Sequence, residues 1–430
     1  MLNKARAKLS NDLIYINDRE YHLPNKPAVV ICYDGMDPSY LADATTRGLS
    51  PNLSAMAQHG LYASAHSAMP SFTNPNNVSI VCGAPPRVHG ISGNYWYDRA
   101  TGEEVMMTDA GPLGAPTILA GLSEAGVKVA AVTAKDKLRK ALAVGLVGDG
   151  GRGIAFSAEK ASACTLAEHG IAGEEAQAGE PVPDQYSPEL SLFVLDAGLR
   201  LLSSGRAEVL YLSLSDFVQH AHAPGAPDSD AFIRAVDRRV GALLDAGAMV
   251  GIVADHGMTD LSLVDGSPNI LYLGDRLDAR YGAGQTRVIC PITDPFVRHH
   301  GALGGFVRIH VLGDLDHAEV RDFLSRIPGV ELALLREDMC RRFDQPMERE
   351  GDVAVIAGKG VALGTHDGAH ALAELAGTRL RSHGSLAERN VPFLVSHPLT
   401  AAYRRKAATE QLHNYDIFDF VLNGTRETEA

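Results

Sequence analysis

Six side chains of this sequence have the types and the spacing of ligands for divalent metal ions. They are, in chain order, Asp34, Asp216, His220, Asp255, His256 and His383. Carboxylate oxygens and imidazole nitrogens suit zinc and other divalent transition metals. Six ligands are more than one tetrahedral ion takes, but they are a natural set for two ions. The sequence therefore predicts a hydrolase with a two-metal site.

The spacing of these residues fits ligands that approach an ion together. Asp216 and His220 are four residues apart, so a helical turn would place both side chains on one face. Asp255 and His256 are adjacent and can meet one ion only where the backbone turns sharply, which Gly257 would permit. Taken singly, each residue could instead be a cap, a turn residue or a satisfied buried group. Together they indicate cations, because crowded carboxylates would otherwise repel and raise one another's pKa.

A polar segment over residues 70–77 offers a nucleophile. It leads into an apolar run that begins at Val78, so Thr73 lies near the start of a predicted helix. Free N–H groups and the dipole at a helix N-terminus favour anions. A threonine hydroxyl in that place could be deprotonated and directed at a phosphoryl group. The alternative is that Ser71 or Thr73 only caps the helix.

Short apolar runs alternate with helical stretches and predict the elements that position these residues. Runs typical of strands buried on both faces cover 28–33, 127–133, 209–214 and 249–254. Helices are predicted over 116–125, 188–203 and 230–246. This alternation predicts an α/β fold with a mostly parallel central sheet flanked by helices. Asp34, Lys135, Asp216 and Asp255 follow the four runs, so they should share the edge of the sheet where such folds carry their chemistry.

The pattern changes after Met258 and predicts an inserted unit. Alternating strands are expected over 305–312, 330–335 and 352–357, a helix over 318–327, and a return to the core sheet at 391–396. We therefore expect a metal-binding catalytic core from residues 1–260 and 380–430, with a small α+β cap from residues 261–379. Candidate cap residues for substrate contact stand in a Gly-flanked loop, namely Arg298, His299 and His300.

Composition limits the classes of partner. The 430 residues carry a formal charge of −13, which argues against broad nucleic-acid binding but not against a small anionic substrate in one cleft. The five cysteines are scattered without a CxxC pair, so no disulfide framework is expected. No apolar run approaches the roughly 20 residues that span a bilayer, and the first residues lack the apolar core of a signal peptide. We expect a cytoplasmic enzyme without membrane or nucleic-acid partners.

The whole series of candidate residues resembles the alkaline phosphatase superfamily, over about residues 28–396. Residues 90–98, which include Asn94, resemble the loop whose asparagine contacts phosphoryl oxygens in the nucleotide pyrophosphatase/phosphodiesterase branch and its phosphonate-cleaving relatives. The resemblance implies an alkaline-phosphatase-like core, a homodimer, Thr73 as the nucleophile that forms a phosphothreonine intermediate, and Asn94 as an oxygen clamp. It also implies two zinc ions per subunit, one held by Asp216, His220 and His383 and the other by Asp34, Thr73, Asp255 and His256. Manganese, iron and cobalt remain possible at such ligands.

Two lysines, Lys135 and Lys137, follow a predicted core strand and should point into the same cleft. Solvated surface lysines are the alternative. The segment resembles that of the phosphonoacetate hydrolases, in which paired lysines hold the carboxylate of the substrate. The expected reaction is therefore cleavage of the carbon–phosphorus bond of phosphonoacetate to acetate and phosphate. Ammonium groups would stabilise charge that develops on the leaving group in the transition state.

Three other functions stay open at this point. A nucleotide phosphodiesterase needs an aromatic slot for a base, and although aromatic residues make up only 6% of the chain, Tyr95, Trp96 and Tyr97 could supply one. A phosphoglycerate-mutase-like enzyme resembles this chain in its metal ligands but uses serine. The third alternative is a non-catalytic metal-binding scaffold on a retired hydrolase fold, although every ligand position and the nucleophile are present here.

Overall fold

The structure is a computed structural model that describes residues 8–10, 12–148, 151–294, 301–375 and 377–425. Its largest sheet has eight strands in the order β11-β8-β12-β4-β13-β22-β5-β23. They are β4 (Ala28–Cys32), β5 (Leu61–His66), β8 (Val129–Thr133), β11 (Ile154–Ser157), β12 (Val209–Ser213), β13 (Met249–Val253), β22 (Asn390–Val395) and β23 (Leu412–His413). The strands from β11 to β13 are parallel, and β22 runs antiparallel to both of its neighbours.

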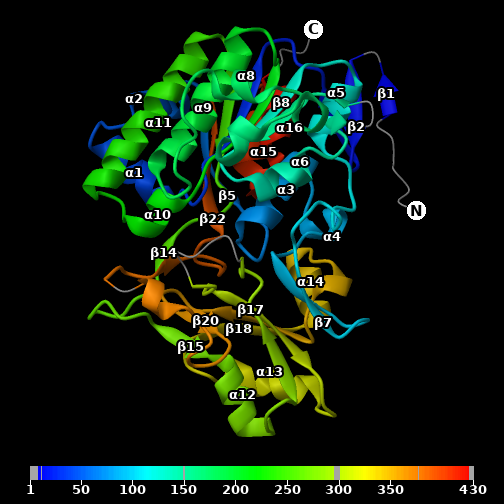
Figure 1. The fold of residues 1–430 in the computed structure, drawn as a ribbon, viewed down its shortest axis with the longest axis vertical. Coiled ribbons are helices and arrows are strands. Elements are labelled where there is room, and N and C mark those ends of the chain that lie inside the picture. Colours follow the sequence, from blue (N-terminus) through cyan, green and yellow to red (C-terminus); the bar gives the residue numbers. More distant parts are fainter. Residues whose placement is uncertain (1–7, 11, 149–150, 295–300, 376, 426–430) are drawn as a thin grey trace.

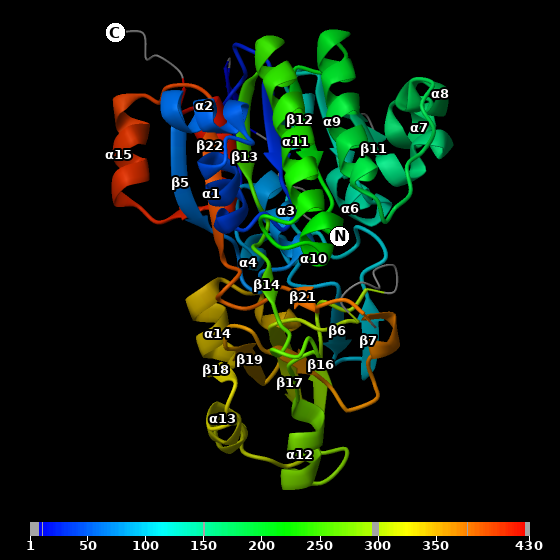
Figure 2. The ribbon, with the colours of Figure 1, turned by 90° about the vertical axis from the view of Figure 1, so that its left-hand side faces the viewer.

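Helices cover both faces of this sheet, which explains why its central strands are continuous apolar runs. Every residue of β8, β12, β4 and β13 is buried. One set of helices consists of α2 (Pro51–His59), α9 (Pro188–Ser203) and α11 (Pro227–Asp245). The other set, on the opposite side in Figures 1 and 2, consists of α3 (Thr73–Cys82), α5 (Ile118–Glu124), α6 (Asp136–Leu142) and α16 (Ile417–Leu422). The expected α/β fold with a mostly parallel central sheet is confirmed.

The described residues form further α-helices beside these, together with short 3₁₀ helices. The α-helices are α1 (Pro38–Thr46), α4 (Pro86–His89), α7 (Leu166–His169), α8 (Gly173–Gln177), α10 (Phe217–Ala221) and α15 (Ala401–Thr409). The 3₁₀ helices are η1 (Ala158–Ala163), η2 (Met347–Arg349), η3 (Leu372–Leu375) and η4 (Asn414–Asp416). Among the described residues, no helix is both long and apolar enough to cross a membrane.

A second sheet lies at the other end of the molecule, in the lower half of Figure 1. It is antiparallel, in the order β16-β17-β19-β18, with strands β16 (Thr286–Ile289), β17 (Phe306–Val311), β18 (Val330–Leu335) and β19 (Val353–Ala357). Its helices are α12 (Leu273–Tyr281), α13 (His317–Ser325) and α14 (Arg336–Phe343). The sequence pattern predicts three of these strands but not β16, which has only four residues, or the position of β19 between β17 and β18.

One three-stranded sheet and several strand pairs accompany the two larger sheets. They are β1 (Lys8–Ser10) with β2 (Leu13–Ile16) and β3 (Arg19–His22), β6 (Tyr95–Asp98) with β7 (Glu103–Met106), β9 (Val147–Gly148) with β10 (Gly151–Arg152), β14 (Thr259–Asp260) with β21 (Arg381–Ser382), and β15 (Ile270–Tyr272) with β20 (Ala362–Gly364). The four-stranded sheet falls within residues 261–379, and the boundaries of a separate cap domain stay a prediction. All five cysteines are buried and unpaired.

The two sheets have separate apolar cores that meet at the segment before α3. The larger core fills the space between the eight-stranded sheet and its helices. The smaller core surrounds the four-stranded sheet and includes Met69 and Phe72. Since Phe72 directly precedes Thr73, the start of α3 is held by apolar contacts from the second core as well as the first.

Candidate metal and phosphoryl-transfer site

The six predicted ligands come together at the carboxyl ends of the parallel strands. Asp34 follows β4, Asp216 follows β12 and begins α10, and Asp255 follows β13. None of the six residues is more than 4% exposed. They form two groups of potential ligands, in each of which the ligand atoms lie within 4.8 Å of one another.

The first group consists of Asp216, His220 and His383. The Nε2 atom of His220 lies 2.9 Å from Asp216 Oδ2, and the Nε2 atom of His383 lies 3.9 Å from the same oxygen. Asp216 and His220 share one face because α10 supplies the helical turn that their spacing predicts. His383 reaches them from the end of β21, far along the chain.

The second group consists of Asp34, Asp255 and His256. His256 Nε2 lies 3.3 Å from Asp34 Oδ1 and 3.8 Å from Asp255 Oδ2. Gly35, at φ 70°, provides the left-handed backbone next to this group. The role expected of Gly257 is different in the structure: its φ is not positive, and a Cβ there would lie 2.9 Å from a carboxyl oxygen of Asp37.

All three histidines have the same orientation, with Nδ1 on a backbone carbonyl. His220 Nδ1 lies 2.6 Å from Arg381 O, His256 Nδ1 2.9 Å from Gly257 O, and His383 Nδ1 2.8 Å from the carbonyl of Ser71. A carbonyl oxygen only accepts, so each Nδ1 carries the hydrogen of that bond and each ring turns its Nε2 toward the carboxylates. This is the arrangement in which outer hydrogen bonds orient metal-binding histidines.

Electrostatics in the two groups also favour a cation. Burial, with the nearby Asp216 and Asp255, raises the pKa of Asp34 well above its ordinary value. Burial and the two neighbouring imidazoles lower the pKa of His383 well below its ordinary value. Asp34 Oδ1 is buried and has no hydrogen-bond partner among the described residues. Ionised carboxylates and lone pairs that face each other in a buried site are compatible when divalent cations lie between them, so the residues fit two such ions.

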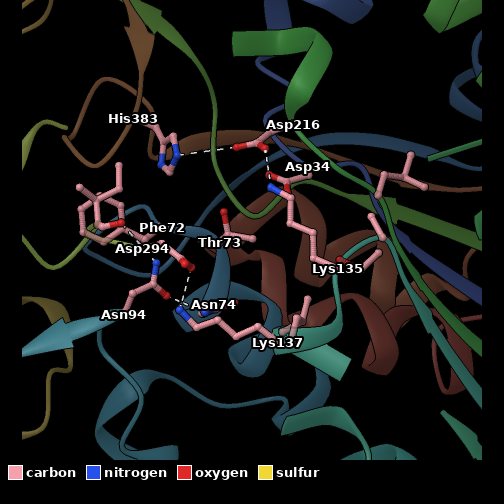
Figure 3. Close-up of a pocket in the computed structure, with 15 residues that line it drawn as sticks. Asp34, Phe72, Thr73, Asn74, Asn94, Lys135, Lys137, Asp216, Asp294 and His383 are labelled. Atoms are coloured by element: carbon pink, nitrogen blue, oxygen red, sulfur yellow. Dashed lines mark hydrogen bonds and ion pairs between the residues drawn. The ribbon is translucent and has the colours of Figure 1, made fainter. Parts of the chain in front are cut away.

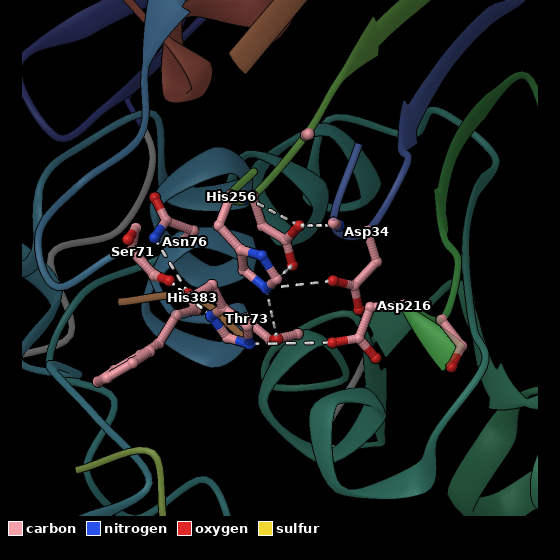
Figure 4. Close-up of polar contacts among 12 residues, drawn as sticks. Asp34, Ser71, Thr73, Asn76, Asp216, His256 and His383 are labelled. Atoms are coloured by element: carbon pink, nitrogen blue, oxygen red, sulfur yellow. Dashed lines mark hydrogen bonds and ion pairs between the residues drawn. The ribbon is translucent and has the colours of Figure 1, made fainter. Parts of the chain in front are cut away.

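Thr73 lies between the two groups (Figure 4). It is the first residue of α3, as the sequence predicts, and its Oγ1 lies 3.1 Å from His256 Nε2. One turn later, Asn77 donates hydrogen bonds to Thr73 O at 3.0 Å and to Asp255 Oδ2 at 3.0 Å. Asn77 Oδ1 in turn accepts from the hydroxyls of Tyr211 and Ser213. Sequence reasoning gave Asn77 no role, although its position four residues after Thr73 was a usable signal.

Phe72, the residue before Thr73, contacts the ring of His383 and so holds the start of α3 against this potential ligand. The Phe72 ring packs edge-on against the His383 imidazole, with centroids 5.7 Å apart. Gly384 has φ 118°, and a Cβ there would lie 2.4 Å from Phe72 Cε1. Both the backbone conformation and the close contact therefore require glycine at this position.

A pocket with about 620 Å³ of space, part of it open to solvent, adjoins Thr73. In Figure 3, Asp216 and His383 lie above Thr73, and Asn94 and Lys137 lie below it. Its polar lining consists of Asp34, Thr73, Asn74, Asn94, Lys135, Lys137, Ser213, Asp216, Asp294 and His383. Tyr95, Trp96 and Tyr97 do not line it, and Trp96 is instead covered by the guanidinium of Arg349 at 4.1 Å.

Asn94, Lys135 and Lys137 all line this pocket, and their roles stay predictions. Asn94 Oδ1 accepts a hydrogen bond of 2.6 Å from Asn74 Nδ2, which orients its amide group. Lys135 Nζ lies 3.8 Å from Asp216 Oδ1, and Lys137 Nζ lies 2.7 Å from Asp294 Oδ2.

One pocket residue was not predicted from the sequence, and one group of predicted residues is not tested. Asp294 was missed because nothing in its local sequence indicates that it meets α6 across the two parts of the chain. The candidate cap residues at 298–300 lie outside the described residues. His89 is a structural residue in this part of the chain, since it is buried and bonds Ser79 Oγ and Ile91 N.

The sequence model of the type I phosphodiesterase/nucleotide pyrophosphatase family matches residues 28–385. The chain therefore belongs to this family. It is similar to the phosphonoacetate hydrolase from Sinorhizobium meliloti 1021, solved with phosphonoformate and with phosphonoacetate, at 44% identity and a TM-score of 0.90. That match covers 97% of this chain and 100% of the other.

More distant matches agree with this fold. Murine ectonucleotide pyrophosphatase/phosphodiesterase 5, in an inactive variant with AMP, has a TM-score of 0.62 at 16% identity, with 94% of this chain and 97% of that chain covered. An uncharacterized pyrophosphatase/phosphodiesterase of Schizosaccharomyces pombe is 36% identical over 77 residues, which is 18% of this chain and 15% of that relative. The chain thus matches well under two thirds of that curated relative's length.

Proposed function

We propose that this chain hydrolyses the carbon–phosphorus bond of phosphonoacetate and gives acetate and phosphate. The observation that carries the proposal is the convergence of Thr73, Lys135 and Lys137 on one pocket beside two buried groups of potential metal ligands. The similarity to a phosphonoacetate hydrolase over 97% of the chain supports the same substrate.

The proposed metal is zinc, with two ions per subunit. Asp216, His220 and His383 would hold one ion, and the other would be held by Asp34, Thr73, Asp255 and His256. When bound, such cations neutralise phosphoryl charge and lower the pKa of a hydroxyl or water. The oriented Nε2 atoms and the buried carboxylates are the features that support this assignment.

The reaction has two displacements at phosphorus. Thr73 Oγ1 gives up its proton to solvent and forms a bond to phosphorus while the carbon–phosphorus bond breaks. The electron pair of the broken bond passes to carbon and the adjacent carboxylate. Lys135 and Lys137 stabilise that charge, and the released carbon takes up a proton to give acetate. Water then cleaves the bond between phosphorus and Thr73 Oγ1 and releases phosphate. The amide of Asn94 binds a phosphoryl oxygen in both steps.

A nucleotide phosphodiesterase is the second candidate because the family to which the chain belongs is that of the type I phosphodiesterases and nucleotide pyrophosphatases. It is disfavoured by the position of Tyr95, Trp96 and Tyr97 outside the pocket, since a nucleobase needs an aromatic or apolar surface to stack on. The charged lysine end of the pocket instead suits a small anion. A non-catalytic metal-binding scaffold is disfavoured by the position of Thr73 Oγ1, which lies 3.1 Å from Nε2 of the potential ligand His256, where a nucleophile is required.

The test is phosphate release from phosphonoacetate, phosphonopyruvate and a nitrophenyl phosphodiester side by side, with zinc content measured on the same sample. We expect phosphonoacetate to have the highest kcat/KM and the protein to contain about two zinc ions per chain. Preference for the phosphodiester would replace this proposal with the second candidate. A homodimer and a cytoplasmic location also stay predictions, which sedimentation and cell fractionation would test.

A further inference from the structure

Ser71 makes three hydrogen bonds to the segment that carries His383, which lies 312 residues away along the chain. Its carbonyl oxygen accepts from His383 Nδ1 at 2.8 Å. Its hydroxyl accepts from Gly384 N at 3.1 Å and donates to Ser385 O at 2.9 Å. Ser71 is fully buried, and Figure 4 shows it beside His383 on the side away from Asp216. One buried serine therefore contacts three consecutive residues of this segment.

The same serine stands two residues before the proposed nucleophile, Thr73. It does not cap α3, because Phe72 holds the cap position and makes no side-chain hydrogen bond there. Both hydrogen bonds of the Ser71 hydroxyl are made to the His383 segment instead. The hydroxyl thus joins the segment of the nucleophile to the segment of a potential metal ligand.

The second group of potential ligands is held without Ser71. His256 Nδ1 bonds the carbonyl of the next residue, Gly257, at 2.9 Å. Asp255 Oδ2 accepts from Asn77 Nδ2 at 3.0 Å. In the part of the chain that the structure describes, the hydrogen bonds of Ser71 reach the ligand segment of the first group only.

We infer that Ser71 is a positioning residue that sets the metal affinity of the first group, Asp216, His220 and His383, and has much less effect on the second. The inference rests on the proposed function, since it requires both groups to bind metal. Without the hydroxyl, Gly384 N and Ser385 O would lose a buried hydrogen-bond partner, so the segment should shift and turn the Nε2 of His383 away from its ion. Loss of such outer contacts weakens metal binding by about 10- to 100-fold.

The test measures both zinc dissociation constants of Ser71→Ala by competition with a chromophoric chelator. We expect one constant to rise by about tenfold or more and the other by less than about threefold. Ser79→Ala is the matched control, because Ser79 is also fully buried and its hydroxyl bonds His89 Nε2 at 2.8 Å. This control loses a buried hydrogen bond on α3 without contact to the His383 segment, so both of its constants should equal those of the unaltered protein.

Two further backgrounds assign the effect to one group. In His383→Asn, addition of Ser71→Ala should weaken the remaining ion little further. In Asp255→Asn, it should weaken the remaining ion by the same factor as in the unaltered protein. Equal constants in Ser71→Ala and Ser79→Ala, or equal weakening of both ions by Ser71→Ala, would overturn the inference.

The unaltered protein gives an independent reading that needs no folded variant. Because coupling is reciprocal, zinc should slow hydrogen exchange of the Gly384 amide by about tenfold or more. Exchange that zinc leaves unchanged would overturn the inference. These readings measure binding, so they still test Ser71 if the protein binds two zinc ions and fails to cleave phosphonoacetate. A protein that binds no zinc would overturn both this inference and the proposed metal site.

Discussion

The imidazole rings of His256 and His383 are stacked, with centroids 3.4 Å apart and planes only 6° from parallel. The two rings belong to different groups of potential ligands, and each presents its Nε2 to the carboxylates of its own group (Figure 4). Their separation is close to the roughly 3.5–4 Å between cations in two-metal hydrolases. Because the rings are in contact, a shift of the imidazole in one group should displace the imidazole in the other.

Removal of metal should destabilise the protein, and Asp34→Asn should reduce that effect. Burial and two neighbouring aspartates raise the pKa of Asp34, so in metal-free protein the ionised form costs stability, and this cost grows as pH rises from the unfolded value through the raised one. At neutral pH the variant should unfold at higher urea than the unaltered protein when both are treated with a chelator, by at least about 1 kcal/mol. With zinc present the order should reverse. A lower stability of the variant in chelator would contradict the crowded-carboxylate account.

Replacement of Thr73 by alanine should abolish turnover without emptying the site. The six other proposed ligand residues stay in place, so zinc content should remain near that of the unaltered protein. Loss of the attacking oxygen should lower kcat by about a thousandfold or more. Thr73→Ser keeps a hydroxyl and should retain part of the activity. Turnover is measured as phosphate release, and zinc content is measured on the same samples. Full activity in the alanine variant would contradict a covalent mechanism.

Substitution of Lys135 or Lys137 by alanine should harm phosphonoacetate cleavage far more than cleavage of nitrophenyl phosphate. The aryl leaving group needs no help from an ammonium group, whereas the carbon leaving group does, and one such charge contributes about 3 kcal/mol or a hundredfold. Lys140→Ala is the matched control because this lysine is exposed on α6. The measurement is kcat/KM on both substrates for each variant. Equal losses on the two substrates would show that the lysines do not stabilise the leaving group.

His89 should make the stability of the protein sensitive to acid. Burial lowers the pKa of His89 to about 3, and its Nδ1 accepts from Ile91 N at 3.2 Å, so the ring is neutral in the folded state. The unfolded chain takes up a proton below about pH 6.5 and the folded chain does not, so stability is complete above that pH and falls as pH drops. The loss should reach about 2 kcal/mol by about pH 5.

Urea unfolding at several pH values, in chelator, checks this dependence. His89→Asn should show a shallower fall in unfolding free energy than the unaltered protein, although it is less stable at neutral pH because buried hydrogen bonds are altered. His59→Asn, at the exposed end of α2, should follow the unaltered curve. Parallel curves for all three proteins would show that His89 does not titrate as described.

Much of the fold follows from short-range patterns. The apolar runs predict β4, β8, β12 and β13 within two residues, because strands buried on both faces must be apolar throughout. The helical period predicts α9 to the residue. The four-stranded sheet was less predictable, since β19 pairs with β17 and β18 over loops whose lengths do not specify the order.

The sequence by itself determined the local parts of the site: Asp216 and His220 on one helical turn, Thr73 at the start of α3, and a polar residue after each core strand. Only the tertiary structure decided which of these parts meet, namely the stack of His256 on His383, the bonds of Asn77 to Thr73 and Asp255, and the pairing of Lys137 with Asp294. The physical reason is that periodicity and capping act over a few residues. Contacts between distant segments depend instead on how whole sheets and helices pack.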